Sequence, residues 1–147
     1  LRPPQLDALG LEAALRWHAE RLLRNAGIEA ALDIHPLPQR PDPGVEQACF
    51  RIAQEAMTNA LRHAAPSRVS LRLDDRGDCL HLSVSDDGRG FDTPADGGLG
   101  LAIMRERAHG VGGGFDIHST HGSGTTVEAL LPYEPAPNAK HAGQPAG

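Results

Sequence analysis

The chain has 147 residues and a formal net charge of −5 at neutral pH, and aromatic residues make up only 3% of it. A chain of this length can close one domain of two packed layers, whose core must be built from Leu, Val, Ile and Ala. No basic run is present to neutralise phosphate groups, which argues against a nucleic-acid partner.

The first part of the chain predicts a helix, a strand and a loop. Leu1–Pro4 ends in two prolines, which break any helix that arrives from upstream. Apolar residues at helical spacing predict a helix over Leu11–Asn25, with Gly27 as its C-terminal stop. Alternation over Ile28–Ile34 predicts a strand, and four prolines make His35–Gly44 a loop.

The rest of the chain predicts two more helices and two pairs of strands. The expected helices begin near Val45 and at Leu101, and the expected strand pairs are Val69–Leu73 with Leu80–Val84 and Phe115–Ile117 with Thr125–Leu131. From Glu134 onward the sequence has nothing to bury, so we expect a disordered tail. The order of elements predicts an α+β fold: a two-layer α/β sandwich with a mixed, mostly antiparallel sheet and helices packed on one face.

The second predicted helix carries Glu55, Asn59 and His63 at intervals of four residues. This spacing places a carboxylate, an amide and an imidazole along one strip of an α-helix, beside its apolar face. Carboxylate and amide oxygens are ligands that suit Mg²⁺. Taken alone, the strip is more often the polar flank of an amphipathic helix, because short motifs recur by chance.

Two glycine-rich motifs follow later in the chain. Asp86, Gly88 and Gly90 form a D-x-G-x-G motif directly after a predicted strand, where an acidic side chain could accept a hydrogen bond from an exocyclic amine. Gly98 and Gly100 open the third predicted helix, whose N–H groups could hold phosphate oxygens. Each motif alone is also compatible with an acidic turn or a flexible connector.

Together these motifs resemble the nucleotide-binding catalytic domain of two-component sensor histidine kinases, within the ATPase superfamily shared with gyrase, the heat-shock chaperone and the mismatch-repair protein. The stretches RIAQEAMTNALRHA, DDGRGF, GLGLAIMRERA and GSGTTV are similar to those of the nitrate-sensing subclass. The resemblance runs from about Leu11 to Pro132. It implies a linker or the end of a dimerisation region over residues 1–10, an ATP-binding catalytic domain over 11–133 and a disordered tail over 134–147.

The resemblance also implies a role for individual residues toward ATP and Mg²⁺. Asn59 would ligate the metal, and Glu55 would hold a metal-bound water or polarise the attacking group. Asp86 would bind the adenine amino group with support from Thr125. The other implied nucleotide contacts are Gly88 and Gly90 beside the base, Gly98, Leu99 and Gly100 facing the phosphates, and Arg62 and His63 near the phosphates; residues 91–97 would form a short lid.

Kinases of this kind transfer the γ-phosphoryl group of ATP to a histidine on a separate two-helix dimerisation element. That histidine precedes an acidic residue, and none of the eight histidines here does so. We therefore expect the acceptor to lie outside this chain, which begins at Leu1 and looks like part of a longer protein. The implied partners are its own dimerisation and phosphoacceptor domain and a response regulator, in a homodimeric parent.

The composition also bears on location. Two cysteines, Cys49 and Cys79, are too few for a disulfide framework, so we expect reduced, core-packed thiols and a cytoplasmic domain. No apolar run approaches the about 20 residues that cross a bilayer, and there is no signal peptide. Whether the parent is anchored in the inner membrane stays open.

Two other functions stay open beside the histidine kinase. One is a serine-directed kinase of the anti-sigma-factor type, against which GLGLAIMRERA and LRPPQLDALGL speak. The other is an ATP-sensing module that transfers no phosphate, against which the presence of Glu55 and Asn59 argues.

His118 and His121 could suggest a metal pair, but the turn expected there favours solvent-facing side chains. Trp17 is expected to pack at the junction of helix and sheet.

Overall fold

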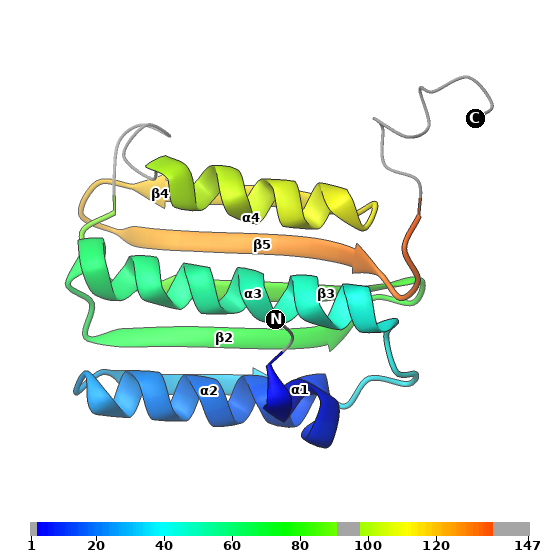
Figure 1. Ribbon diagram of the computed structural model, residues 1–147. Helices are drawn as coiled ribbons and strands as arrows, with labels where there is room; N and C mark the ends of the chain where they lie inside the picture. The colour runs from blue at the N-terminus through cyan, green and yellow to red at the C-terminus, as the bar shows by residue number, and fades with distance from the viewer. Residues whose placement is uncertain (1–2, 91–97, 137–147) are drawn as a thin grey trace.

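The computed structural model describes residues 3–90 and 98–136. Within these ranges the chain forms helices and strands in the order that the sequence predicts, with a short helix added at the start and a π-helical turn in the middle. The elements are α1 Pro4–Leu9, α2 Leu11–Asn25, β1 Glu29–Ile34, α3 Pro43–Asn59, the π-helical η1 Ala60–Ala64, β2 Arg68–Asp75, β3 Cys79–Asp86, α4 Gly98–Gly110, β4 Gly114–Thr120 and β5 Gly124–Pro132 (Figure 1).

The strands form one mixed sheet in the order β1-β2-β3-β5-β4. β1 and β2 are parallel, because the chain crosses over through α3 between them, and the other described pairs are antiparallel. Helices α2, α3 and α4 lie side by side on one face of the sheet, with α2 against β1 and α4 against β4 and β5 (Figure 1). This two-layer arrangement confirms the predicted fold class.

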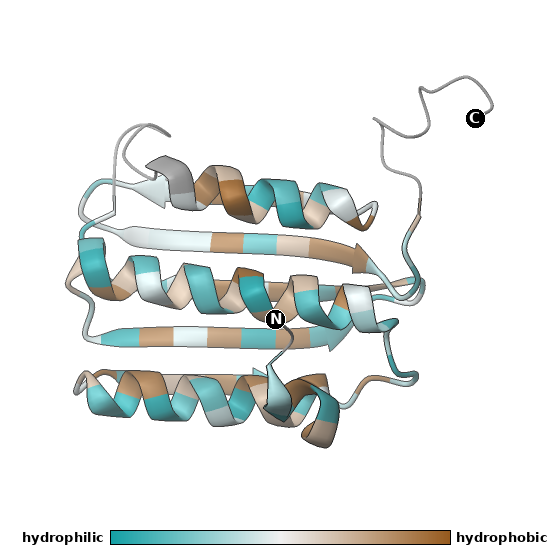
Figure 2. Cartoon of the chain, viewed as in Figure 1, coloured by the Kyte–Doolittle hydropathy of each residue, from teal (hydrophilic) through white to brown (hydrophobic). Residues whose placement is uncertain are grey.

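The core lies between the sheet and the helix layer. Val69, Leu71 and Leu73 of β2 are fully buried, whereas Arg72 between them is exposed. Figure 2 shows this alternation as hydrophobic and hydrophilic bands along the strands. The helices meet these strand residues with small and aliphatic side chains, among them Ile52, which is also fully buried. Because apolar groups fill the interior almost everywhere, their burial supplies most of the folding free energy.

The prolines near the start of the chain were expected to break a helix, but they stand at the beginning of one. Pro4 occupies the first turn of α1, where a proline is favoured because its fixed φ suits the helix. Leu6 of this helix is fully buried, and its carbonyl accepts a 3.4 Å hydrogen bond from Nη2 of Arg40. Arg40 also binds the buried carboxylate of Glu46 through Nε at 3.1 Å. The sequence analysis missed α1; the assignment of residues 1–10 to a linker stays a prediction.

The central helix differs from its prediction at both ends. It begins at Pro43, two residues before Val45, because the side chain of Asp42 accepts a 2.9 Å hydrogen bond from the backbone N–H of Gly44 and caps the first turn. After Asn59 the hydrogen bonding changes from α-helical to π-helical through η1. A π turn holds more residues than an α turn, so the prediction of α-helical geometry as far as His63 is wrong.

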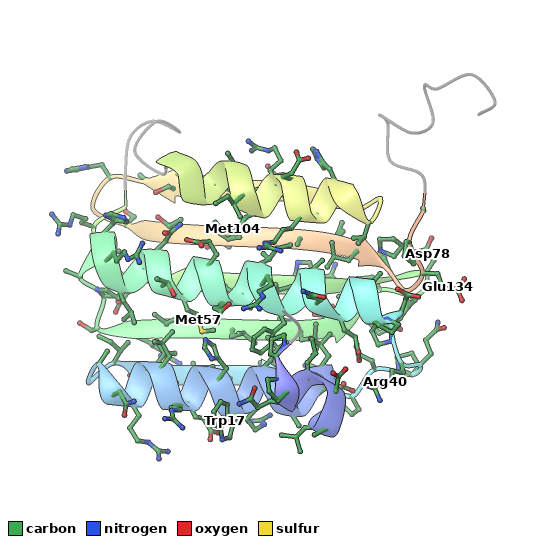
Figure 3. All side chains as sticks on the ribbon, viewed as in Figure 1. Trp17, Arg40, Met57, Asp78, Met104 and Glu134 are labelled. Atoms are coloured by element: carbon green, nitrogen blue, oxygen red, sulfur yellow. The ribbon has the colours of Figure 1, made fainter. Side chains whose placement is uncertain are left out.

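Trp17 does not pack at the junction of helix and sheet. Its side chain is 40% exposed on the outer side of α2, where the Arg21 guanidinium lies 5.1 Å from its ring centroid (Figure 3). The reason is helical geometry: Leu15 and Ala19 are both fully buried, and a residue midway between them points to the opposite side.

Several further expectations concern the cysteines, the tail and the membrane. Cys49 is a fully buried free thiol whose pKa is raised by burial, and Cys79 is free and partly buried.

Of the predicted tail, the structure describes residues 134–136, in which the N–H of Ala136 donates to the carbonyl of Val111 at 3.1 Å. The remainder lies outside the described residues. In the described part of the chain, no helix has the length and apolar character that a bilayer crossing needs.

Tyr133 fastens the end of β5 to the end of β2. Its side chain is 4% exposed, and its hydroxyl donates a 2.6 Å hydrogen bond to Oδ1 of Asp75. We expect Tyr133→Phe to lower the free energy of unfolding by about 1 kcal/mol, because it removes one charge-assisted hydrogen bond and keeps the ring. Urea denaturation measures the effect. Asp75→Asn, which keeps an acceptor, should lose less, and unchanged stability of Tyr133→Phe would contradict this account.

Candidate functional site

A cavity of about 310 Å³ opens between α3, α4 and the sheet, beside the end of β3 and the start of β5. Its volume is near the lower limit of about 300–1,000 Å³ that is typical of ligand pockets. The walls are mostly apolar, and a few polar groups converge on the space. The lining residues are Ala56, Asn59, Ala60, His63, Ala64, Val84, Asp86, Gly90, Leu101, Met104, Ile117, His121, Thr125 and Val127.

Five of the residues singled out in the sequence meet in this lining. They come from α3, η1, the end of β3, the loop after it and the start of β5, and these segments are separated in the chain. They are Asn59, His63, Asp86, Gly90 and Thr125. The strands bring two of them together directly, because Asp86 and Thr125 are partners in the β3–β5 register. The predicted convergence of distant segments on one space is therefore present.

The two acidic residues after the β3 core have opposite surroundings. Asp86 is half-buried, and its Oδ1 accepts a 2.8 Å hydrogen bond from the N–H of Gly88. Burial raises the pKa of Asp86, although the hydrogen bond from Gly88 opposes the change. Asp87 is exposed, and hydrogen bonds from the backbone N–H groups of Arg68 and Ser67 lower its pKa. Asp87 thus fastens the start of β2, while Asp86 faces the cavity.

The loop after β3 packs against the end of the central helix. The N–H of Arg89 donates a 2.9 Å hydrogen bond to the carbonyl of Ala64. A Cβ built on Gly88 would lie 2.3 Å from that same carbonyl oxygen, so no larger residue fits at this position. At Gly90, where φ is +64°, a Cβ would lie 2.2 Å from the carbonyl oxygen of Thr120. Because these two glycines have no side chain, the neighbouring main chains can pack closely against each other. This role was not predicted from the sequence.

The first turn of α4 crosses directly over Glu55 and Asn59. A Cβ built on Gly100 would lie 2.6 Å from Nδ2 and 3.1 Å from Oδ1 of Asn59, and 3.1 Å from Oε2 of Glu55. The side chains of Glu55 and Asn59 thus lie next to each other against the first turn of α4, and carboxylate and amide oxygens are donors that suit Mg²⁺. Among the described residues no cluster of three or more His, Cys, Asp or Glu side chains could hold a metal. An ion here would take its other ligands from water or a bound anion.

The cavity has two ends, which we name by their residues. The strand end comprises Asp86, Gly90 and Thr125, and the helix end comprises Asn59 with the adjoining Glu55 and Gly100.

The other predicted residues lie outside the lining. Arg62 is exposed on η1, and Gly98 begins α4. The side chain of Leu99 and the proposed lid, residues 91–97, lie outside the described part of the structure. Positions in α4 and on the rim can still contact a ligand that extends beyond the cavity itself.

Sequence reasoning missed two parts of the lining. One is the set of small and aliphatic side chains. Of these, Ala56, Ala60 and Ala64 recur every four residues, a spacing that could have been noticed in the sequence. The other is His121, which was expected to face solvent; its side chain is exposed, as a turn residue should be, yet it also lines the cavity. His118 is 66% exposed and does not line the cavity.

Comparison with known proteins identifies relatives of this arrangement. Residues 44–135 match the family model described as "Histidine kinase-, DNA gyrase B-, and HSP90-like ATPase". The oxygen sensor histidine kinase NreB of Staphylococcus carnosus is 38% identical over 135 residues, which are 90% of this chain and 39% of that protein. The sensor histidine kinase MctS of Rhizobium johnstonii is 37% identical, over 90% of this chain and 30% of that protein. The chain thus spans about a third of the length of these relatives.

Solved structures have the same fold. The histidine kinase domain from the blue-light activated histidine kinase of Erythrobacter litoralis EL346 superposes with a TM-score of 0.71 at 27% identity, covering 84% of this chain and 61% of that one. A mycobacterial sensor histidine kinase, MprB, gives a TM-score of 0.63 at 22% identity, covering 86% of this chain and 94% of the other, which supports the fold alone.

Gly88→Ala tests how tightly the loop after β3 packs against Ala64. The added methyl group would meet a backbone carbonyl that cannot move cheaply, so we expect the free energy of unfolding to fall by about 1–3 kcal/mol. Chemical denaturation measures the loss. Gly114→Ala is the matched control, because a Cβ there meets nothing within 4 Å. Equal stability of the two variants would show that the contact is not tight.

Proposed function

The chain belongs to the histidine kinase-, DNA gyrase B- and HSP90-like ATPase family, and we propose that it is the ATP-binding catalytic domain of a sensor histidine kinase. We assign this domain to residues 11–133, with a linker before it and a tail after it. The observation that carries the proposal is the single cavity on which Asp86 and Thr125 converge from one side and Asn59, beside Glu55, from the other.

We assign the strand end of the cavity to the adenine base. The carboxylate of Asp86 can accept a hydrogen bond from an exocyclic amino group, and Thr125 lies beside it in the sheet. The hydroxyl of Thr125 is 2.8 Å from Oγ of Ser119, which fixes its position. Apolar side chains line the space beyond, among them Met104 of α4 (Figure 3). A flat, largely apolar base with one amino group suits such surroundings.

We assign the helix end to the phosphate groups. The N-terminus of α4 begins at Gly98 and passes over Glu55 and Asn59 at Gly100. Unpaired N–H groups at a helix N-terminus, together with the helix dipole, favour phosphate oxygens. Asn59, with Glu55 through a water molecule, would hold Mg²⁺, which when bound would neutralise charge on the phosphates. We also propose that the exposed Arg62, which precedes the lining residue His63 on η1, adds a positive charge near the phosphates.

The chemical work of the chain is then to position the γ-phosphate. Phosphoryl transfer needs little covalent participation from the protein, so holding the base and the phosphates at fixed positions supplies most of the effect. We propose Glu55 as the catalytic residue, since it is the carboxylate next to the phosphate end. The acceptor would be a histidine of a dimerisation domain outside this chain, in a homodimeric parent, and a response regulator would receive the phosphoryl group. We further propose that the domain lies in the cytoplasm.

Asp86→Asn tests the assignment of the adenine end. Asn keeps one acceptor oxygen, but the N–H of Gly88 would bind it and leave the amide NH₂ facing the amino group of adenine. We therefore expect ATP affinity to fall at least about tenfold, which is the cost of roughly one lost hydrogen bond to a charged group. Because a carboxylate must be the acceptor and burial raises the pKa of Asp86, affinity should also decline as the pH is lowered through that raised pKa. Isothermal titration calorimetry measures both effects.

Asp116→Asn is the matched control for this measurement. Asp116 lies on β4 with its side chain 75% exposed and does not line the cavity, so ATP affinity should stay at the wild-type value. Unaltered affinity in Asp86→Asn would count decisively against the assignment.

Phosphoryl transfer is tested with labelled ATP, Mg²⁺ and the dimerisation domain of the same parent protein. We expect acid-labile label on a histidine of that domain, and its loss in Glu55→Gln, because the variant lacks the proposed carboxylate. Acid-stable label on a serine would instead indicate a serine-directed kinase. Binding of ATP without any transfer would indicate a sensing module.

A further inference from the structure

The turn between β4 and β5 brings an imidazole, that of His121, into the cavity lining. The main chain on both sides of this residue is fastened to the loop after β3. Gly90 packs against the carbonyl of Thr120, and the N–H of Gly122 donates a hydrogen bond to the carbonyl of Arg89. His121 therefore belongs to the strand end of the cavity and is held there by main-chain contacts.

The described lining offers few aromatic surfaces for a flat ligand. It contains no Phe, Tyr or Trp, and small or aliphatic side chains form most of it. Two imidazoles, His63 of η1 and His121 of the turn, are the aromatic groups among these lining residues. Nucleobases gain binding free energy by stacking on aromatic side chains, histidine included. An imidazole beside the base-binding end is thus placed to make this contact.

We propose that His121 stacks its imidazole ring on the adenine of the bound nucleotide and thereby sets the affinity for the base. The inference rests on the proposed function, because it assigns the strand end to adenine. In this arrangement Asp86 reads the edge of the base, whereas His121 covers a face of it from the β4–β5 turn.

The sequence supplies a matched control three residues earlier. The side chains of β4 alternate, so Ile117 lines the cavity while His118 points away from it. His118 is 66% exposed, and its Nε2 lies 3.9 Å from Oδ2 of Asp116. His118→Ala and His121→Ala therefore remove the same side chain from neighbouring positions of one hairpin, and only the second change reaches the cavity.

Calorimetric titration of the variants tests the contact. We expect His121→Ala to raise the dissociation constant of ATP about tenfold, within the range for loss of one base–aromatic contact. The factor should be the same for ADP, because the contact is with the base and not with the γ-phosphate. His121→Phe keeps an aromatic face and should bind ATP within about threefold of wild type, as should His118→Ala.

The outcomes separate this inference from the function on which it rests. Failure of the wild-type chain to bind ATP overturns both. Loss of binding in Asp86→Asn together with wild-type affinity in His121→Ala overturns the role of His121 and leaves the proposed function standing. Equal weakening in His121→Ala and His121→Phe overturns stacking.

A measurement on the wild-type chain does not depend on the nucleotide affinities of the variants. Ring-current effects should shift the carbon-bound imidazole proton resonances of His121 when ADP is added, since they would lie over the face of the base. The His121→Phe spectrum identifies these resonances by their absence, and those of His118 serve as the unmoved reference. Resonances of His121 that stay in place at saturating ADP overturn the proposal.

Discussion

The site depends on one contact between two main chains, at the point where the central helix ends and the loop after β3 begins. The carbonyl of Ala64 accepts a hydrogen bond from the N–H of Arg89, and Gly88 leaves just enough room for the two backbones to meet. This contact joins the helix layer to the loop at the end of β3, the middle strand of the sheet. Together with the apolar core between the two layers, this contact fixes the distance between Asp86 and Asn59.

Two further contacts of the same kind complete the frame. Gly90 brings the β4–β5 turn against the loop, and Gly100 brings the first turn of α4 over Asn59. In each case the glycine has no side chain, so its backbone can lie close to another part of the chain. The polar groups of the site are therefore positioned by contacts of the main chain and not by flexible side chains. Such a frame suits the positioning that the proposed phosphoryl transfer requires, since small displacements of reacting groups cost large factors in rate.

Features with a regular period could be predicted from the sequence. The bounds of α2 and the alternation of β2 and β3 follow directly from apolar spacing, and the fold class follows from their order. The motif around Asp86 was also visible, because its residue types carry its chemistry. Where these segments meet in space was supplied by resemblance to a known family and not by periodicity, because spacing within one element says nothing about contacts between elements.

The misses have local physical causes. The π-helical turn has no signature in the apolar pattern, so π-helical geometry around His63 was not predicted, although His63 still lines the same cavity as Asn59. Trp17 was expected to pack at the junction of helix and sheet, although its position in the helical repeat directs it outward. His121 was treated as a plain turn residue, because the docking of its turn on the loop after β3 is a tertiary contact.

The π-helical turn also separates two tasks of the central helix. Glu55 and Asn59 lie before η1, in α-helical geometry, and Ala64 lies at its end, against the loop. A π turn accommodates one residue more than an α turn. Changing the length of this short segment would rotate the wall that abuts the sheet loop while leaving the preceding α-helix in register with α4. The π-helical turn thus sets the direction in which the end of the central helix meets the loop after β3, separately from the residues that face α4.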